Sequence, residues 1–246
     1  MQFPTLYQTA PHPCPYIEEN TAVNLILDPH YPVTNSLYGR LLQHGFRRNG
    51  SLYYRPFCND CSACISVRVP VDEFRCNRAQ RRTLKRNADI ETRLTPARFS
   101  DEHFNLYLHY QATRHTGDSM DDPDPDKYRR FLVDSEVDTS FIEFRKDGEL
   151  LAVSIIDVVD DGLSAIYTFF DPDQPSRSLG TLAVLKQIEL ARDGGLDWLY
   201  LGYWIAASRK MAYKRKFRPL QRFDTFSARW EYFDEIEQTP IDKPLE

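Results

Sequence analysis

The chain has 246 residues, of which 41% are hydrophobic and 27% are charged. This length and composition are typical of a globular protein with one large or two modest domains, and they exclude wholesale disorder and collagen. The 31 basic and 36 acidic residues give a formal net charge of -5, which taken alone argues against a nucleic-acid partner. The longest apolar stretches, 150–156 and 163–170, have the length of strands and are too short for a bilayer. Because the N-terminus also lacks a signal-peptide pattern, we expect a cytoplasmic protein without a membrane partner.

The first part of the chain is rich in proline and then predicts a helix and two strands. Thr34 is a typical N-cap, apolar residues follow at helical spacing over 37–42, and Gly45 is a natural helix end. The segments 52–55 and 65–71 contain β-branched and aromatic residues. We interpret them as a strand pair closed by the cysteine-rich loop between them.

The cysteines favour metal binding over a disulfide framework. They are five in number: Cys14, Cys58, Cys61, Cys64 and Cys76. In a reducing compartment, the spacing of Cys58, Cys61 and Cys64 lets thiolates converge on one ion, with Cys14 as a fourth ligand. Four sulfurs suit zinc or an iron-sulfur cluster. The alternative is a loop in which the thiols only pack as small hydrophobic groups, as we expect for Cys76.

A basic segment follows the cysteines. Its cations are Arg75, Arg78, Arg81, Arg82, Lys85 and Arg86. If 75–86 is a helix, steps of about 100° per residue place all six cations within an arc of about 140°. A second basic block spans 209–218, and without the two blocks the chain has 19 basic and 36 acidic residues. Because neither block contains an acid that could pair with it, contact with a phosphate backbone competes with the alternative of a solvated helix face.

The middle of the chain predicts a connector, a helix and a strand meander. We interpret 89–99 as the connector between a small N-terminal module, 1–95, and a larger C-terminal domain, 96–246. Ser100 is a helix cap, and the helix runs to Arg114 and His115 before Gly117 stops it. An acidic, proline-broken loop and a short helix follow. The strands 140–145, 150–159 and 163–170 are joined by Asp-Gly turns, which predicts an antiparallel meander.

The C-terminal part alternates helices and strands. We expect a helix over 179–192 capped by Ser178, a strand over 198–205, a helix over 208–217 and a last strand over 223–232. This order predicts the α+β or mixed α/β class. The turn Arg177-Ser-Leu-Gly-Thr181 lies at a helix start, where free N–H groups attract phosphate, although an ordinary helix cap has the same pattern. The order of meander, glycine loop, helix and strand resembles the GNAT acyltransferase fold, which is an analogy of fold alone.

Several long motifs resemble the arginyl-tRNA-protein transferase family. They are LYGRLLQHGFRRNGSLYYRPFCNDCSACISVRVPVDEFRCNRAQRRTLKRNADI, YTFFDP, RSLGTLAVLKQIELAR and LYLGYWIAASRKMAYKRKFRPL. The resemblance extends from Cys14 to about Leu220 and is closest to the short bacterial branch, the aspartate/glutamate leucyltransferases. It implies transfer of an aminoacyl group from aminoacyl-tRNA to the α-amine of a protein beginning with Asp or Glu, which marks that protein for the N-degron pathway. Leucine as donor follows from the branch alone, and arginine is the alternative.

The resemblance also implies a GNAT-like domain after a small cysteine-containing module, and it gives roles to particular residues. The basic blocks become tRNA contacts, with Lys214 and Arg215 from the second block. The loop of Arg177, Ser178, Gly180 and Thr181 becomes a site for the terminal adenosine or its phosphate. Cys14, Cys58, Cys61 and Cys64 match the metal-associated region of eukaryotic relatives. In GNAT relatives a tyrosine placed like Tyr213 serves the leaving group. Arg114, His115 and Lys210 are candidates for binding the acidic side chain, because a buried carboxylate needs a cation.

The chemistry that the resemblance implies needs no cofactor. An aminoacyl ester is already activated, and an α-amine with a pKa of about 8 is partly neutral at working pH. Positioning of the ester and the amine can therefore supply much of the acceleration. Two other interpretations remain open at this point. One is a CoA-dependent N-acetyltransferase, and the other is a non-enzymatic RNA-binding protein stabilised by metal.

Overall fold

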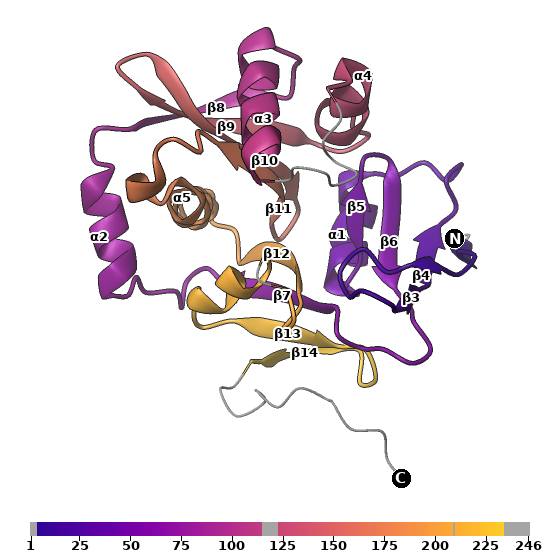
Figure 1. The fold of residues 1–246 in the computed structure, drawn as a ribbon. Helices are drawn as coiled ribbons and strands as arrows, with labels where there is room; N and C mark the ends of the chain where they lie inside the picture. Colours follow the sequence, from indigo (N-terminus) through magenta and orange to yellow (C-terminus); the bar gives the residue numbers. More distant parts are fainter. Residues whose placement is uncertain (1–3, 115–122, 209, 234–246) are drawn as a thin grey trace.

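The computed structural model describes residues 4–114, 123–208 and 210–233, and its centre is an eight-stranded sheet (Figure 1). The strand order is β14 (Arg229–Tyr232), β13 (Gln221–Asp224), β7 (Ile65–Pro70), β12 (Trp198–Trp204), β11 (Gly162–Phe170), β10 (Glu149–Val159), β9 (Thr139–Lys146) and β8 (Glu91–Pro96). The pair β11 and β12 is parallel, and the other neighbouring pairs are antiparallel. The mixed α/β class predicted from the sequence is therefore confirmed. No helix in the described ranges combines the length and the apolar character needed to cross a membrane.

The predicted meander is confirmed as β9, β10 and β11. Its first turn places Asp147 at φ 51° and Gly148 at φ 87°, a left-handed pair whose twist matches that of antiparallel strands. In β10 the residues from Leu150 to Asp157 are all buried. This unbroken burial has a physical reason, since helices cover both faces of the sheet at this strand.

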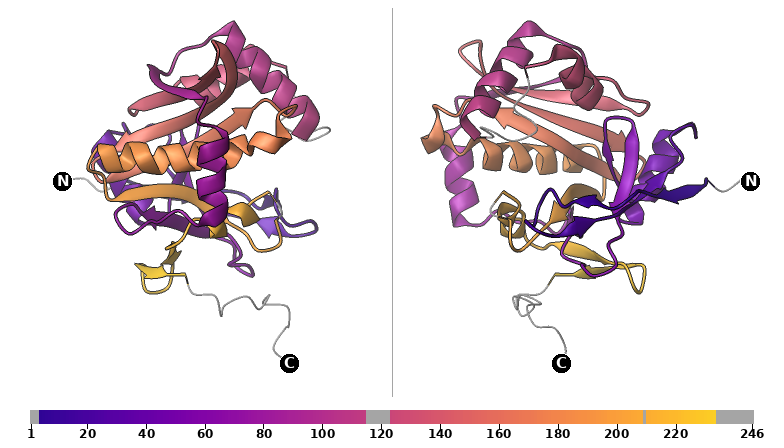
Figure 2. Two further views of the ribbon diagram at one scale, coloured as in Figure 1. Left: turned by 90° about the vertical axis from the view of Figure 1, so that its left-hand side faces the viewer. Right: turned by 45° about the vertical axis from the view of Figure 1, so that its right-hand side comes forward.

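Helices form a layer on each face. On one face α5 (Leu179–Asp193) packs with α2 (Arg78–Arg86) on β10, β11 and β12. On the other face lie α1 (Asn35–Gln43), α3 (Asp101–Arg114), α4 (Pro125–Tyr128) and the π-helical turn η1 (Arg129–Val133). Figure 2 shows α2 crossing the end of α5. The helices expected before 45, after Ser100 and after Ser178 are thus confirmed, whereas the basic helix begins at Arg78 because Asn77 and Gln80 form a capping box there.

The N-terminal residues build two small sheets beside the large one. The first has the order β1 (Leu6–Gln8), β4 (Asn24–Leu27), β6 (Leu52–Pro56) and β5 (Arg47–Asn49), and the second pairs β2 (His12–Pro13) with β3 (Thr21–Ala22). The expected pairing of 52–55 with 65–71 is wrong, because β6 pairs with β4 and β5 while β7 lies between β13 and β12. Residues 66–70 of β7 are all buried, which suits the interior of the large sheet.

The large sheet contains strands from both sides of residue 95. Both β7 and β8 precede that position, and β8 pairs with β9 at the sheet edge. The expectation that 89–99 is only a connector is therefore wrong, and the division into 1–95 and 96–246 stays a prediction. A buried ion pair also joins the sheets: the Arg48 guanidinium of β5 donates to Asp157 of β10 at 2.6 Å from both Nε and Nη2, with both side chains fully buried.

Two expectations near the C-terminus are wrong. Instead of a helix over 208–217, the described residues form only the short 3-10 helix η3 (Ala212–Lys216). Instead of one strand over 223–232, the chain makes the hairpin β13–β14. The Asp224 carboxylate accepts the N–H groups of Phe226 at 3.0 Å and Ser227 at 3.1 Å, which reverses the chain in an Asx turn.

Candidate functional site

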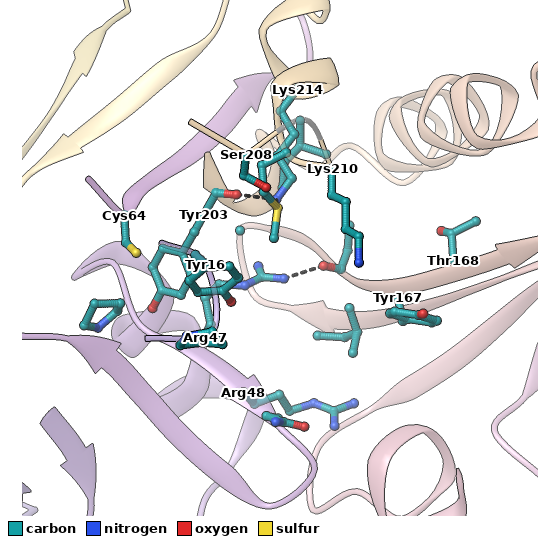
Figure 3. A pocket seen from close by; sticks show the side chains of 18 of the residues that line it. Tyr16, Arg47, Arg48, Cys64, Tyr167, Thr168, Tyr203, Ser208, Lys210 and Lys214 are labelled. Atoms are coloured by element: carbon teal, nitrogen blue, oxygen red, sulfur yellow. Dashed lines mark hydrogen bonds between the residues drawn. The ribbon is translucent and has the colours of Figure 1, made fainter. Parts of the chain in front are cut away.

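A cavity of about 1940 Å³ opens between the N-terminal sheets and the large sheet. Its walls come from many segments: the N-terminal segment 12–24, strands β5 and β6, the cysteine loop, the end of α3, α4 and η1, strands β11 and β12, the chain before α5 and the start of that helix, the segment 208–214, and the turn between β13 and β14. Figure 3 shows its centre, with Arg47 and Arg48 from one side and Lys210 and Lys214 from the other. Most of the segments that the sequence marked for chemistry therefore meet at one place.

The cavity is strongly cationic. Among its described lining residues are seven Arg and Lys side chains and no Asp or Glu, although the chain has 36 acids. The cations are Arg47, Arg48, Arg55, Arg114, Lys127, Lys210 and Lys214. A concave surface of one sign focuses the field and concentrates ligands of the opposite charge. The arrangement suits a polyanion or an acidic chain end.

The parallel strands β11 and β12 separate at the cavity. Their register runs only from Gly162 opposite Trp198 to Ser164 opposite Tyr200. Beyond this point the buried guanidinium of Arg47 enters the gap and donates to Ser164 Oγ at 3.0 Å and to the carbonyl of Ala165. Both strands then continue along the cavity wall with backbone groups that do not pair with each other.

A bulge in β12 makes room for Arg47. The register with β7 shifts between Tyr200 and Gly202, and Gly202 has φ 78°. A Cβ atom at this position would stand 3.0 Å from Arg47 Nε. Glycine is therefore required twice, for the left-handed backbone and for the close approach of the guanidinium.

Lys214 is buried in the cavity wall, with only 6% of its surface exposed. Its Nζ donates to the carbonyl of Tyr203 at 2.5 Å and contacts Met211 Sδ at 3.4 Å. Burial, and then the charge of Arg47, lowers the pKa of Lys214 to about 7. Figure 3 shows its amine end between Tyr203 and the Arg47 guanidinium. Lys214 therefore lies inside the site and does not continue an exposed cationic stripe.

Two tyrosines lie next to this lysine in the fold. Tyr213 lines the cavity with 39% of its surface exposed, and enclosure by the walls followed by the charge of Tyr110 raises its pKa to about 12. The hydroxyl of Tyr203 donates to the carbonyls of Gly45 at 3.2 Å and Tyr54 at 3.1 Å. Both phenols thus keep their protons at neutral pH.

The glycine loop lies at the cavity edge. Ser178, Gly180 and Thr181 line it, and Gly180 packs so closely on Phe170 that a Cβ atom would be 3.2 Å from the ring. Ser178 adopts φ 55° and its side chain makes no capping hydrogen bond, so the expectation of a side-chain cap is wrong. Its carbonyl accepts the N–H of Thr181 at 2.9 Å.

Arg177 is directed to α2 rather than to the cavity. Its guanidinium makes two hydrogen bonds of 2.9 Å to Asp89, and these hold the pKa of Asp89 down at about 2. Asn87 Nδ2 donates to the Arg177 carbonyl at 2.8 Å, and Arg86 donates to the carbonyl of Ser176. The end of the basic helix is thus bonded to the loop that opens α5.

The six cations predicted to form a stripe are all exposed: Arg75, Arg78, Arg81, Arg82, Lys85 and Arg86. Gln80 and Thr83 form the buried side of the helix. Arg78, Arg82 and Lys85 have no recorded ion pair with the residues that the structure describes. The stripe therefore presents its charge to solvent, and none of the six cations lines the cavity.

The candidates for acceptor binding lie in different surroundings. Arg114 and Lys210 line the cavity, and the Arg114 guanidinium lies 5.7 Å from the centre of the Phe170 ring. His115 falls outside the described residues. Arg215 is stacked on Trp204 at 5.3 Å and Phe233 at 4.8 Å, away from the cavity lining.

Cys14, Cys58, Cys61 and Cys64 line one wall as half-buried free thiols. Burial, and then the charges of Cys14, Cys61 and Cys58, raises the pKa of the Cys64 thiol to about 12. Four sulfurs are a chemically suitable donor set for zinc or an iron-sulfur cluster. However, a metal site needs at least three ligand atoms close together. Among the described His, Cys, Asp and Glu side chains, the set with three ligand atoms within 4.8 Å of one another is His109, Asp171 and Asp173, and it contains no cysteine. The sulfur positions therefore do not form a closed metal site, and metal binding stays a prediction.

Sequence reasoning missed Arg47 and the burial of His103. Arg47 lies in the run Phe46-Arg-Arg-Asn, where two arginines in a segment with apolar neighbours were the available signal. His103 is buried on α3, where its Nε2 lies 2.7 Å from Glu143 Oε1, although a histidine in a helix gives no sign of burial in the sequence alone. Cys76 packs against the main core as expected.

Comparison with known proteins identifies similar chains. Family models described as arginine-tRNA-protein transferase match residues 12–82 with the N-terminal model and residues 102–224 with the C-terminal model. An aspartate/glutamate leucyltransferase of Hahella chejuensis is 50% identical over 87% of this chain and 92% of its own length. One of Stenotrophomonas maltophilia is 48% identical over 94% of this chain and 93% of its own length. Among solved structures, FemX has a TM-score of 0.44 at 8% identity, covering 81% of this chain and 79% of that one.

Proposed function

Because the chain belongs to the arginine-tRNA-protein transferase family, we propose that its cavity is where leucine passes from leucyl-tRNA to proteins that begin with Asp or Glu. The chain is an aminoacyltransferase, and the relatives that match it at 45–50% identity are leucyltransferases. A protein that gains leucine in this way enters the N-degron pathway of degradation.

The observation that carries this proposal is the absence of acidic side chains among the described residues that line the cavity. Both substrates are anionic where they meet: the RNA end carries phosphates and the acceptor carries a carboxylate. Arg48 is neutralised by the buried Asp157 carboxylate and burial favours the neutral form of Lys214, so the positive charge that attracts both substrates comes from the other five cations of the lining: Arg47, Arg55, Arg114, Lys127 and Lys210. An acidic lining would repel them.

The position of the basic helix supports a path for the RNA. The exposed cations of α2 stand beside the loop that opens α5, because Arg86 and Asn87 bond to it. From there Ser178, Gly180 and Thr181 lead into the cavity. We place the acceptor stem of the tRNA on α2 and its terminal adenosine or phosphate at the start of α5, where the helix dipole favours negative charge. The separated parallel strands beside this loop support a GNAT-like domain.

The chemistry within this frame is aminolysis of an ester. The acceptor nitrogen attacks the leucyl carbonyl carbon, the C–N bond forms, and the bond to the ribose oxygen breaks. Holding ester and amine together supplies much of the rate. Tyr213, whose pKa is raised to about 12, keeps the proton that a leaving ribose oxygen needs. A metal held by Cys14, Cys58, Cys61 and Cys64 would stabilise the cysteine loop, and no step depends on it.

Arg114 and Lys210 are the cations proposed for the acceptor carboxylate, because both line the cavity. Arg114→Ala or Lys210→Ala should lower kcat/KM for Asp and Glu peptides about 10-fold or more, since a hydrogen bond to a charged group contributes about 1.5–3 kcal/mol. A peptide beginning with Ala should lose much less. Kinetics with the three peptides measure this selectivity, and an equal loss for all three would remove both residues from this role.

The function itself is tested with purified protein and labelled aminoacyl-tRNA. Leucyl-tRNA and arginyl-tRNA are each incubated with peptides beginning with Asp, Glu or Ala, and mass spectrometry records which peptide gains a residue. We expect leucine on the Asp and Glu peptides. Gain of arginine alone would change the donor, and no gain with either tRNA would refute the function.

A further inference from the structure

Aminolysis requires a group that removes a proton from the acceptor nitrogen, and the cavity offers few. Its described lining contains no carboxylate. Enclosure by the cavity walls raises the pKa of Tyr203 and Tyr213, so these phenols hold their protons and are poor bases at neutral pH. The lining also contains His12, but this residue belongs to β2, which pairs with β3 in a separate two-stranded sheet. Carboxylates are thus absent from the described lining, and its histidine lies outside the large sheet that carries β11 and β12.

Lys214 is the basic group that burial makes suitable. It has no carboxylate partner among the described residues, and its side chain is covered by the wall that ends β12. A neutral amine has two N–H bonds and one lone pair. Tyr203 O at 2.5 Å and Met211 Sδ at 3.4 Å take the two hydrogens, which leaves the lone pair for a guest in the cavity.

Given the proposed function, we infer that Lys214 is the general base of the transfer, accepting a proton from the acceptor α-amine beside the separated ends of β11 and β12. The α-ammonium first loses one proton to Lys214 and from there to solvent. The neutral amine attacks the leucyl carbonyl carbon, and the attacking nitrogen passes a second proton to the Lys214 amine. That proton returns to the ribose oxygen as the C–O bond breaks, through Tyr213 or directly. The products are an amide, a free ribose hydroxyl and one released proton.

The groups around Lys214 keep it in the neutral form. Arg47 approaches from β5 and its positive charge opposes protonation of the lysine, as burial does. Tyr203 on β12 offers its carbonyl, while its hydroxyl bonds to Gly45 and Tyr54. Lys210 and Tyr213 belong to the same segment and add no negative charge. With its pKa at about 7, Lys214 is about half neutral at pH 7 and mostly neutral above it.

The test is the pH dependence of single-turnover transfer from leucyl-tRNA to an Asp peptide. The wild-type rate should rise through two inflections, one near pH 7 from the enzyme and one from the peptide amine. Lys214→Arg carries a permanent positive charge and cannot accept a proton, so its rate should fall about 10²–10⁴-fold. The inflection near pH 7 should vanish and the peptide inflection should remain. Lys214→Met should show the same loss.

Two controls separate this inference from folding and from the proposed function. Lys186→Met removes a lysine that pairs with Glu189 at 2.7 Å, outside the cavity, and should keep the wild-type profile. Filter binding of leucyl-tRNA should give Kd values within about threefold of wild type for both Lys214 variants.

If wild type transfers leucine and the Lys214 variants keep the rate or the inflection near pH 7, Lys214 is not the base. If the rate falls only in proportion to tRNA affinity, that outcome also overturns the inference. If wild type transfers nothing, the proposed function itself fails.

Discussion

Lys214 shows how burial changes the meaning of a residue within a basic run. In the sequence it stands among Lys210, Arg215 and Lys216 and looks like one more surface cation. In the structure it is buried against Tyr203, and its pKa falls to about 7. A charged amine in this place destabilises the fold, because its unfolded pKa is 10.5.

This cost predicts a pH-dependent stability of Lys214→Met. Because the folded pKa is depressed, the cost is absent above pH 10.5, grows as the pH falls, and is complete below about pH 7. We expect the variant to be more stable than wild type by an amount on the order of 2–4 kcal/mol at pH 6. The gain should shrink towards pH 10. Urea unfolding at pH 6, 8 and 10 measures it, and an equal difference at all three values would contradict the buried charge.

Tyr213 is proposed to donate a proton to the leaving ribose oxygen, and removal of its hydroxyl tests this role. Tyr213→Phe keeps the aromatic ring, whose centroid lies 6.4 Å from that of Phe217 in an edge-to-face arrangement, and removes the hydroxyl that donates the proton. The single-turnover transfer rate should fall by about 10²-fold, the lower end for acid–base groups, with unchanged leucyl-tRNA affinity. Full activity in this variant would show that the ring only packs.

At the scale of elements, the bulge in β12 connects backbone geometry to the site. Gly202 and Gly195 both have positive φ, 78° and 66°, but only a Cβ at Gly202 meets a neighbour, Arg47 Nε at 3.0 Å. Either glycine changed to alanine should lose about 1–2 kcal/mol of stability from the left-handed backbone. Gly202→Ala should in addition lower the transfer rate about 10-fold or more, because Arg47 must leave the gap and a small misplacement of the reacting groups is costly.

Gly195→Ala serves as the matched control, since nothing lies within 4 Å of its Cβ position. Thermal unfolding and single-turnover assays on the two variants separate the backbone effect from the displacement of Arg47. Equal activity in both variants would mean that the position of Arg47 does not matter for transfer.

The elements also show what the sequence could and could not predict. Local signals sufficed for α1, α3, α5 and the meander, because caps, periodicity and Asp-Gly turns lie within each segment. Pairing between distant strands has no local signal, so β6 and β7 were paired wrongly although both were recognised as strands. Within 208–217 the described residues form only η3, whose Lys214 bonds to β12, and such a contact between distant segments has no signal in local helix propensity.

The candidate site follows the same division. Ser178, Gly180, Thr181, Arg114, Lys210 and Tyr213 could be named from motifs, and all of them line the cavity. Arg47 could not be named, because its importance depends on the gap between β11 and β12, which exists only once the sheet has formed. The burial of Lys214 was invisible for the same reason.

At the scale of the whole molecule, two groups of positive charge stand out on an acidic protein. The cavity holds one group of cations and the exposed face of α2 holds the other. Hydrogen bonds from Arg86 and Asn87 to the chain before α5 join the two. Under the proposed function, a tRNA would place its stem on the helix and reach the cavity past this junction.

Salt dependence tests this path. Arg78 and Arg82 lie on the exposed face of α2 and have no recorded ion pair with described residues, so the double change to Ala removes two phosphate contacts. We expect the slope of log K for tRNA against log salt concentration to fall by about 1–2, at roughly 0.9 per phosphate contact in a duplex.

Arg93 and Lys186 changed together to Ala are the matched control, because they remove equal charge from residues paired with Glu91 and Glu189. The control should keep the wild-type slope. Since the stem contact is distant from the ester, the single-turnover rate at saturating tRNA should stay within about threefold of wild type for both variants. If the α2 variant and the control changed the slope equally, binding would depend on net charge and the helix would have no defined place on the RNA.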